Sequence, residues 1–311
     1  MKKHFIGIDL GGTSMKMGLV DENGQVLYET EKPTLKDAKQ ALNQMIEDCK
    51  KIAQQAEVSW EQIGGVGIGL PGFLDIPNGT IVRLTNLSWE NIPIKSIMEE
   101  KLQKRVEIDN DANVAALGEA WCGAGKGVRD LVCVTLGTGV GGGVIVNGQL
   151  VYGLNGFAGE IGHIQIDPDG VPCNCGQKGC LETIASATGI TRLAKEALQR
   201  GESSVLPAQP TTYDVFQAAA KKDQVAQKVL ETAISALARG FALISVVLNP
   251  ARFVVGGGVA KAKERLFDPL RKAYQQQALK FTAQDVEIVP ALLGNQAGFI
   301  GAARLVTVRN N

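Results

Sequence analysis

Hydrophobic side chains recur at helical spacing over residues 36–57 of the chain. The apolar positions are Ala38, Ala41, Leu42, Met45, Ile46, Cys49, Ile52, Ala53 and Ala56. Spacings of three and four residues place such side chains on one face of a helix. The pattern therefore predicts an amphipathic helix over this range.

Short apolar runs that end at turn residues indicate strands. Ile63–Leu70 is one such run and ends at Pro71-Gly72, which is a turn signal. The run Val106–Ile108 leads into Asn110 and Asp111, either of which can begin a helix. Further along, the pattern predicts helices over 184–200, 212–221 and 224–248 and strands near 252–256 and 285–289, which flank one more helix. Strands that alternate with helices in this way indicate the α/β class.

Two segments that lie 126 positions apart share one design. In residues 5–21 and again in residues 134–147, an apolar strand enters a turn of glycine and threonine and a second apolar strand leaves it. Repetition at this distance indicates duplicated domains. We expect a smaller N-terminal α/β lobe of residues 1–118 with a C-terminal helix at about 298–311, and a larger lobe of residues 119–297.

The glycine turns are suited to phosphate binding. Glycines allow backbone N–H groups to converge on a phosphate without interference from Cβ atoms. Asp9 ends the first strand, where a carboxylate can hold a Mg²⁺ ion on that phosphate, directly or through water. Neither turn matches the Walker or the dinucleotide pattern. The simpler alternative is that both turns are only tight turns. A third glycine run, Gly256–Gly258, follows a predicted strand and suits the approach of an adenosine.

One imidazole and three thiols lie within a segment of 23 residues that begins and ends with a carboxylate, at Glu160 and Glu182. The soft or borderline ligands among them are His163, Cys173, Cys175 and Cys180. This set suits a closed tetrahedral zinc site, although its spacing is not that of a zinc finger or ribbon. The alternative is that the cysteines form disulfides or core contacts and that the histidine caps a strand. A reducing compartment argues against the disulfides.

Acidic residues also stand at a strand end that enters a helix, in Asp109-Asn110-Asp111. Open α/β sheets bind their ligands at such positions. A carboxylate there can accept the proton of a substrate hydroxyl while the phosphate loops present the electrophile. Asp111 can equally be the N-cap of its helix, and one acid can serve both purposes.

Composition narrows the classes of partner. The chain has 311 residues, and its 32 basic and 32 acidic side chains give a net charge of zero, so nucleic acid and anionic membranes are not expected as partners. Asp9 interrupts the first apolar run too early for a signal sequence. The longest apolar stretch, Phe241–Leu248, is too short to span a bilayer. We expect a cytoplasmic protein.

The order of these motifs resembles the ROK family of bacterial sugar kinases and repressors. The resemblance is carried by Asp9–Lys16, Gly69–Gly72, Asn110–Asn113, Leu136–Gly143, Glu160–His163 and Cys173–Glu182. It spans nearly the whole chain and is strongest to the ATP-dependent glucokinases of Gram-positive bacteria. It implies an actin-like ATPase (ribonuclease H-like) fold with two lobes around a cleft. The implied reaction is phosphorylation of glucose at its 6-hydroxyl by Mg-ATP.

The resemblance also implies roles for individual residues. Asp111 would be the catalytic base. The sugar hydroxyls would be met by Gly72, Asn110, Asp111, Glu160, His163 and Glu182. ATP would be met by Asp9, Gly11, Gly12, Thr13, Gly137, Thr138, Gly139, Gly256, Gly257 and Gly258. A structural zinc ion would be held by His163, Cys173, Cys175 and Cys180.

Some alternatives remain open within this family. Its repressors carry a DNA-binding helix-turn-helix before the first glycine loop, and here only eight residues precede Asp9. A kinase for fructose, N-acetylmannosamine or N-acetylglucosamine and a non-catalytic sugar sensor are the other candidates. Lys16 can touch a phosphate or only face solvent. The family's habit suggests a homo-oligomer, either a dimer or a tetramer.

Overall fold

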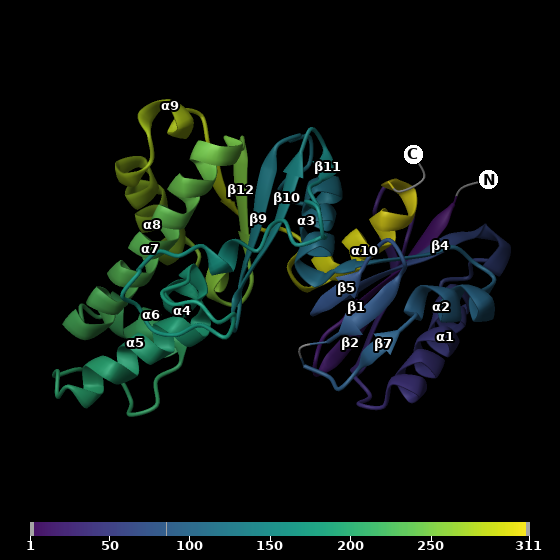
Figure 1. Ribbon diagram of the computed structural model, residues 1–311, viewed down its shortest axis with the longest axis horizontal. Coiled ribbons are helices and arrows are strands. Elements are labelled where there is room, and N and C mark those ends of the chain that lie inside the picture. Colours follow the sequence, from purple (N-terminus) through teal and green to yellow (C-terminus); the bar gives the residue numbers. More distant parts are fainter. Residues whose placement is uncertain (1–2, 85, 309–311) are drawn as a thin grey trace. The chain divides into compact units, whose positions relative to one another are not determined.

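The chain forms two compact units in the computed structural model, which describes residues 3–84 and 86–308 (Figure 1). Unit 1 comprises Met1–Gly127, Gly143–Ala158 and Leu293–Asn311, and unit 2 comprises Val128–Gly142 and Gly159–Leu292. The lobe boundaries given above stay a prediction. Residues 309–311 of the predicted C-terminal helix lie outside the described part of the chain.

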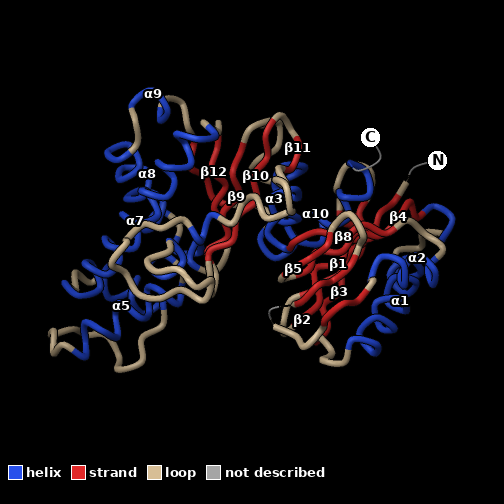
Figure 2. Tube along the Cα trace, in the orientation of Figure 1, coloured by secondary structure: helices blue, strands red, loops and turns tan. Residues whose placement is uncertain are grey.

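Two five-stranded sheets have the same strand order, β3-β2-β1-β4-β8 and β11-β10-β9-β12-β13 (Figure 2, strands in red). The strands of the first sheet are β1 (His4–Leu10), β2 (Ser14–Val20), β3 (Val26–Pro33), β4 (Ile63–Leu70) and β8 (Val106–Asn110). Those of the second are β9 (Leu131–Leu136), β10 (Val140–Val146), β11 (Gln149–Leu150), β12 (Arg252–Gly256) and β13 (Glu287–Pro290). In the first sheet, β1 pairs in parallel with β4, and β4 with β8. In the second sheet, β9 pairs in parallel with β12, and β12 with β13. The predicted α/β class and the two predicted hairpins are confirmed.

A third, small sheet was not predicted from the sequence. It consists of β5 (Phe73–Asp75), β6 (Thr80–Arg83) and β7 (Glu90–Ile92). These strands have three or four residues each, which is too short for a clear alternation of apolar and polar positions.

The helices follow the apolar periodicity closely. In unit 1 they are α1 (Ala38–Gln55), α2 (Ile94–Leu102), α3 (Asp111–Cys122) and α10 (Ala297–Val308). In unit 2 they are α4 (Leu181–Ala185), α5 (Ala187–Gln199), α6 (Thr212–Ala220), α7 (Gln224–Leu248), α8 (Glu264–Gln277) and α9 (Lys280–Ala283). The predicted helix 184–200 is interrupted, because extended Ser186 ends α4 and then caps α5 through its side chain.

The C-terminal helix α10 packs against the sheet of unit 1 through glycine. A Cβ atom at Gly7 in β1 would overlap the carbonyl oxygen of Phe299, and one at Gly67 in β4 would overlap that of Ala302. Any larger side chain at either position would separate the helix from the sheet. The close packing places the first turn of α10 beside the end of β1.

Helix α7 has the length and apolar composition of a membrane span, but 67% of its most apolar window is buried inside the structure. Its buried residues include Leu237, Phe241 and Ile244. A mostly buried helix of this kind is typical of the core of a globular unit.

Candidate active site and metal cluster

Asn110 and Asp111 lie where β8 passes into α3. Asn110 is the N-cap, and its Oδ1 atom accepts the N–H of Ala112 at 2.9 Å. Asp111 is the first helical residue, with an exposed side chain whose Oδ1 atom lies 2.8 Å from the same nitrogen. The alternative in which Asp111 is merely the N-cap is therefore wrong. The capping role uses the oxygen of the Asn110 amide and leaves its nitrogen to donate elsewhere.

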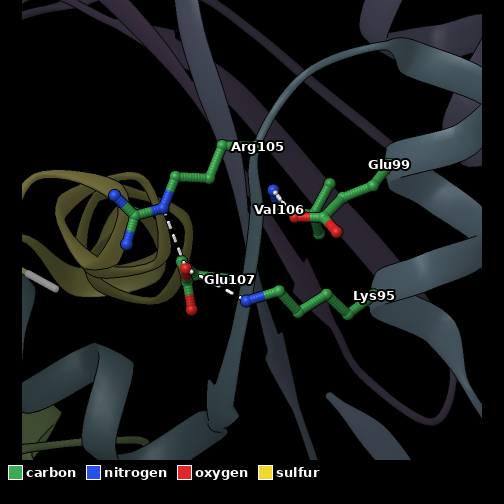
Figure 3. Close-up of polar contacts among 5 residues, drawn as sticks. All are labelled: Lys95, Glu99, Arg105, Val106 and Glu107. Carbon is green, nitrogen blue, oxygen red and sulfur yellow. Dashed lines mark hydrogen bonds and ion pairs between the residues drawn. The ribbon is translucent and has the colours of Figure 1, made fainter. Parts of the chain in front are cut away.

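The start of β8 is anchored by charged side chains (Figure 3). Glu107 is 6% exposed and accepts hydrogen bonds from Arg105 Nε at 2.9 Å and from Lys95 Nζ at 3.2 Å. The carboxylate of Glu99 accepts the backbone N–H of Val106 at 3.0 Å. Because Lys95 and Glu99 belong to α2, these contacts tie that helix to the strand that carries the acidic motif.

The end of β8 is held by a second carboxylate, that of Asp109, which is fully buried. Its Oδ1 atom accepts the Asn110 N–H at 2.7 Å and the side-chain amide of Asn113 at 2.9 Å, and its Oδ2 atom accepts the Tyr152 hydroxyl at 2.7 Å. Asn113 and Tyr152 were not predicted to donate hydrogen bonds to this carboxylate. No local pattern relates the tyrosine to a strand 43 positions earlier.

Asp9 lies on β1 in the same unit. Burial and the nearby charge of Asp111 raise the pKa of Asp9 to about 6, although Lys16, directly opposite on β2, acts in the other direction. A Cβ atom at Gly298, in the first turn of α10, would overlap the Asp9 carboxylate, so glycine makes room for it. The charge of Asp111 acts on Asp9, and Asp111 stands at the N-terminus of α3. A divalent cation and the phosphates that it accompanies can bind at such an arrangement of charges.

The first hairpin turn, between β1 and β2, is closed by its own backbone. The Gly11 N–H donates to the carbonyl of Ser14 at 2.9 Å, and the Thr34 hydroxyl donates to the carbonyl of Gly11 at 2.7 Å. The exposed side chain of Asn86 lies beside Gly12 and was not predicted to be near the turn. Thr13 is exposed, which leaves its hydroxyl accessible.

Gly72 follows β4 at a φ of +108°, a conformation that only glycine adopts readily. It therefore shapes the backbone that enters the small sheet.

In unit 2, four side chains converge on one point. The ligand atoms of His163, Cys173, Cys175 and Cys180 all lie within 4.8 Å of one another. The Cys173 Sγ to His163 Nδ1 distance is 3.6 Å, and so is the distance between the Sγ atoms of Cys175 and Cys180. Tetrahedral zinc with bonds of about 2.3 Å to sulfur and 2.0 Å to nitrogen requires ligand separations of roughly this size. The three cysteines are free thiols, and Cys175 is exposed, so neither the disulfide nor the core interpretation fits this group.

The second hairpin turn, between β9 and β10, is held by Glu182. This residue lies in the first turn of α4, two positions after Cys180, and its Oε2 atom accepts the Val140 N–H at 3.0 Å. Its Oε1 atom lies 3.9 Å from Cys173 Sγ. A Cβ atom at Gly139 would overlap Oε2, so the carboxylate lies directly on the turn. The cysteine loop and the glycine turn are thus joined through one side chain.

The third glycine run lies against the same turn. Gly257 has a φ of +87°, and a Cβ atom there would come within 2.4–2.7 Å of the backbone of Leu136. A short 3₁₀ helix, Val259–Ala262, follows before α8 begins. No atom of residues 3–84 or 86–308 lies within 4 Å of a Cβ built at Gly258, so the described part of the chain leaves the end of the run open to a ligand.

His163 ends a short 3₁₀ helix, Ile161–His163, so the alternative in which it caps a strand is wrong. With Nδ1 directed at Cys173, its Nε2 atom lies 3.9 Å from Glu160 Oε2. That separation is too long for a direct hydrogen bond. Glu160 is exposed, so its carboxylate and the imidazole nitrogen are both accessible to a small polar ligand.

The predicted site residues thus fall into two groups. Unit 1 contains Asp9, Gly11, Gly12, Thr13, Gly72, Asn110 and Asp111, and unit 2 contains Gly137, Thr138, Gly139, Glu160, His163, Cys173, Cys175, Cys180, Glu182, Gly256, Gly257 and Gly258. Within unit 1, Asp9 on β1 is in register with Gly69 on β4, and Gly69 with Asp109 on β8, and the charge of Asp111 acts on Asp9. Within unit 2 it brings together the cysteine cluster, Glu182, the second turn and the third glycine run.

Comparison with known proteins identifies the family. Residues 5–309 match the ROK family. A glucokinase of Halalkalibacterium halodurans is 40% identical over 316 residues, which cover 99% of this chain and 96% of that protein. Among solved structures, a ROK hexokinase from Thermus thermophilus matches with a TM-score of 0.88 and 32% identity over 99% of this chain and 100% of that one. A ROK glucokinase from Streptomyces griseus, solved in complex with glucose and AMPPNP, matches with a TM-score of 0.79 and 32% identity over 97% and 98% of the two chains.

Proposed function

The chain belongs to the ROK family and has the actin-like sugar kinase fold, and we propose that it transfers the γ-phosphoryl group of Mg-ATP to the 6-hydroxyl of glucose. Sugar kinases of the hexokinase type are its relatives over the full chain, and those most similar include glucokinases. The observation that carries the proposal is the position of exposed Asp111 at the start of α3, directly after a strand whose Asp109 is in register, through Gly69 of β4, with Asp9 on β1.

Asp111 is the proposed general base. Its exposed carboxylate stands in the first turn of a helix, whose positive end attracts a negative charge. A sugar hydroxyl that donates to this carboxylate becomes a better nucleophile as phosphoryl transfer proceeds. The amide nitrogen of Asn110 is placed to hold the sugar beside it.

Asp9 is the proposed holder of the magnesium that accompanies ATP. A carboxylate in this position binds the cation directly or through water. Gly11–Thr13 and Gly137–Gly139 are the proposed contacts to the phosphates, through backbone N–H groups other than those of Gly11 and Gly137, which close the two turns. Gly256–Gly258 leaves room for the adenosine.

The metal cluster is proposed to hold one structural zinc ion. Three thiolates and one imidazole fill a tetrahedral site and leave no position for a reacting group. When bound, zinc fixes the cysteine loop. The chain's own side chains then meet the sugar: Glu160, His163 through Nε2, Glu182 and Gly72 are the proposed contacts to its hydroxyls.

The function is tested by measuring kcat/KM for glucose, mannose, fructose, N-acetylmannosamine and N-acetylglucosamine at one concentration of Mg-ATP. We expect glucose to exceed the others by at least tenfold and to yield glucose 6-phosphate, whereas 6-deoxyglucose yields no product. A tenfold advantage for another sugar would contradict the assignment to glucose. Absence of phosphorylation of every sugar would contradict the kinase assignment.

The role of Asp111 is tested by Asp111→Ala. We expect kcat to fall by roughly 10²–10⁴-fold, because the proton acceptor is lost, while the affinity for glucose, measured calorimetrically without ATP, changes much less. Asp268→Ala removes a similarly exposed acid from the surface of α8 and is the matched control. Turnover of Asp111→Ala close to that of the control would exclude Asp111 as the base.

A further inference from the structure

Asp109 is the central acceptor of the β8–α3 junction. It is fully buried and stands one and two positions before the proposed sugar-binding Asn110 and the proposed base Asp111. A buried carboxylate is stable only when hydrogen-bond donors surround it. Two of its donors, the Asn110 N–H and the Asn113 amide, come from the junction itself and fix the local turn.

Tyr152 brings a donor from a distant segment. Its hydroxyl donates to Asp109 Oδ2 at 2.7 Å, which is the short distance typical of a hydrogen bond to a charged oxygen. The backbone carbonyl of Tyr152 accepts the Ala158 N–H at 3.0 Å and closes residues 152–158 into a compact loop. The tyrosine is therefore fixed at both its side chain and its backbone.

The same loop also contacts the segment that follows Gly72. The ring of Phe157 meets that of Phe73 edge-on, with 6.0 Å between the ring centroids. The loop thus joins two places in unit 1 at which sugar contacts are proposed: Gly72, next to Phe73, and the Asn110-Asp111 pair, next to Asp109. All of these contacts lie within one unit.

We propose that Tyr152 is a positioning residue for the sugar: by holding Asp109, it fixes the orientation of Asn110 and Asp111 toward the hydroxyl that reacts. This inference rests on the proposed function, since it assumes that these two residues meet the sugar. The tyrosine itself does not touch the reacting atoms. Its effect is transmitted through one buried carboxylate.

The test is Tyr152→Phe, which keeps the ring and removes the hydroxyl. We expect the KM for glucose to rise about tenfold and kcat to fall about threefold, while the KM for ATP stays within twofold, because loss of a hydrogen bond to a charged group loosens the junction. The matched control is Tyr274→Phe, which removes another buried hydroxyl, bonded to Ser245 at 2.7 Å in unit 2. The control should lower the melting temperature and leave the KM for glucose unchanged.

A double variant tests whether the effect passes through Asp109. If it does, Asp109→Asn combined with Tyr152→Phe should raise the KM for glucose by less than twofold beyond Asp109→Asn alone. Additive effects would overturn the proposal. So would a folded Tyr152→Phe with an unchanged KM for glucose, or a Tyr152→Phe that fails to fold, because the hydroxyl would then serve stability alone.

Failure of the proposed function is recognised separately in the wild-type protein. If the wild-type protein phosphorylates another hexose instead of glucose, the same KM comparison is made with that sugar. If it phosphorylates none, the kinase assignment fails whatever Tyr152 does.

Discussion

The two glycine hairpins have the same sequence design but different supports. The first turn, between β1 and β2, is closed by its own backbone and by Thr34, and its acid, Asp9, stands on the strand itself. The second turn, between β9 and β10, has no acid on its entering strand and receives Glu182 from the helix that follows the cysteine loop. Two hairpins of the same backbone design therefore differ in which acidic side chain lies near the turn and in which segment supplies it. The first hairpin is supported by backbone contacts of its own and by Thr34, whereas the second is supported by a side chain that follows the cysteine cluster.

Loss of the proposed zinc ion should have the largest effect, and it should disturb the second hairpin much more than the first. We expect Cys175→Ser to lose zinc and to lower kcat/KM for glucose by at least about 10²-fold, because the cysteine loop no longer holds Glu182 on the second turn. Metal analysis and steady-state kinetics measure both effects. Cys133→Ser changes a thiol of β9 outside the cluster and is the control for zinc content.

The effect of metal loss on each unit can be followed separately. All three tryptophans, Trp60, Trp89 and Trp121, belong to unit 1. We expect tryptophan fluorescence of Cys175→Ser to report a folded unit 1 while far-UV circular dichroism shows a loss of structure. A full complement of activity in protein that lacks zinc would contradict the dependence of the second hairpin on the cluster.

Replacement of the first hairpin's acid should have the next largest effect. Asp9→Asn keeps the shape of the side chain and removes the charge that is proposed to hold magnesium, so we expect kcat/KM for Mg-ATP to fall by roughly 10²-fold. Zinc content should stay at one per chain, because the cluster belongs to the other unit. Zinc loss in Asp9→Asn would show that the two hairpins are not independent.

A steric change tests the contact between Glu182 and the second turn. Gly139→Ala places a methyl group where Glu182 Oε2 lies, whereas a methyl group at Gly137 meets no atom of the described residues within 4 Å. We expect Gly139→Ala to lower kcat/KM for glucose by about tenfold or more, since displacement of a binding group by about 1 Å is costly. Gly137→Ala should change the KM for ATP more than that for glucose. Equal effects of the two variants on glucose would contradict a specific role for Glu182.

The smallest expected effect is a dependence of stability on pH at the first hairpin. The pKa of Asp9 is raised from 3.8 to about 6, so between these values the folded protein keeps a proton that the unfolded chain has released. The contribution of Asp9 to stability therefore falls as pH rises from about 4 to about 6 and is constant above that range. Asp9→Asn should be more stable than the wild type at pH 7.5 by on the order of 2 kcal/mol, with no difference at pH 4.

Urea unfolding at the two pH values, without nucleotide or magnesium, measures this difference. Asp21→Asn is a useful control, because hydrogen bonds from Gln25 and Asn23 outweigh burial and lower the pKa of Asp21. Asp21→Asn should therefore reduce stability at pH 7.5. An Asp9→Asn that is no more stable than the wild type at pH 7.5 would contradict the raised pKa.

Strongly periodic elements could be predicted from the sequence. The structure places α7 at Gln224–Leu248 and β4 at Ile63–Leu70, as the apolar patterns indicated, because long helices and buried strands carry repeated signals. Strand β3, Val26–Pro33, was missed although its residues alternate between partly buried and exposed positions. The signal was present, but its polar residues made it resemble a loop.

The candidate site was predictable in its parts and not in its connections. Ligand types and their crowding in one short segment indicated the metal cluster, and the position at a strand end indicated Asp111. The contacts of Glu182 with the second turn and of Tyr152 with Asp109 link residues about 40 positions apart. Such contacts arise from tertiary packing, for which a local pattern contains no signal. The same holds for the effect of Asp111 on the pKa of Asp9.

Helix α10 has a consequence for the order in which the protein is made. It fills a face of the first sheet, where Gly7 and Gly67 receive its backbone, yet it follows the rest of that unit by well over a hundred residues. During synthesis, β1 and β4 leave the ribosome long before the helix that covers them, whereas nearly all of unit 2 is translated in one stretch. The apolar face of the first sheet must remain uncovered in the nascent chain until then. The earliest strands to emerge are therefore among the last to be fully packed.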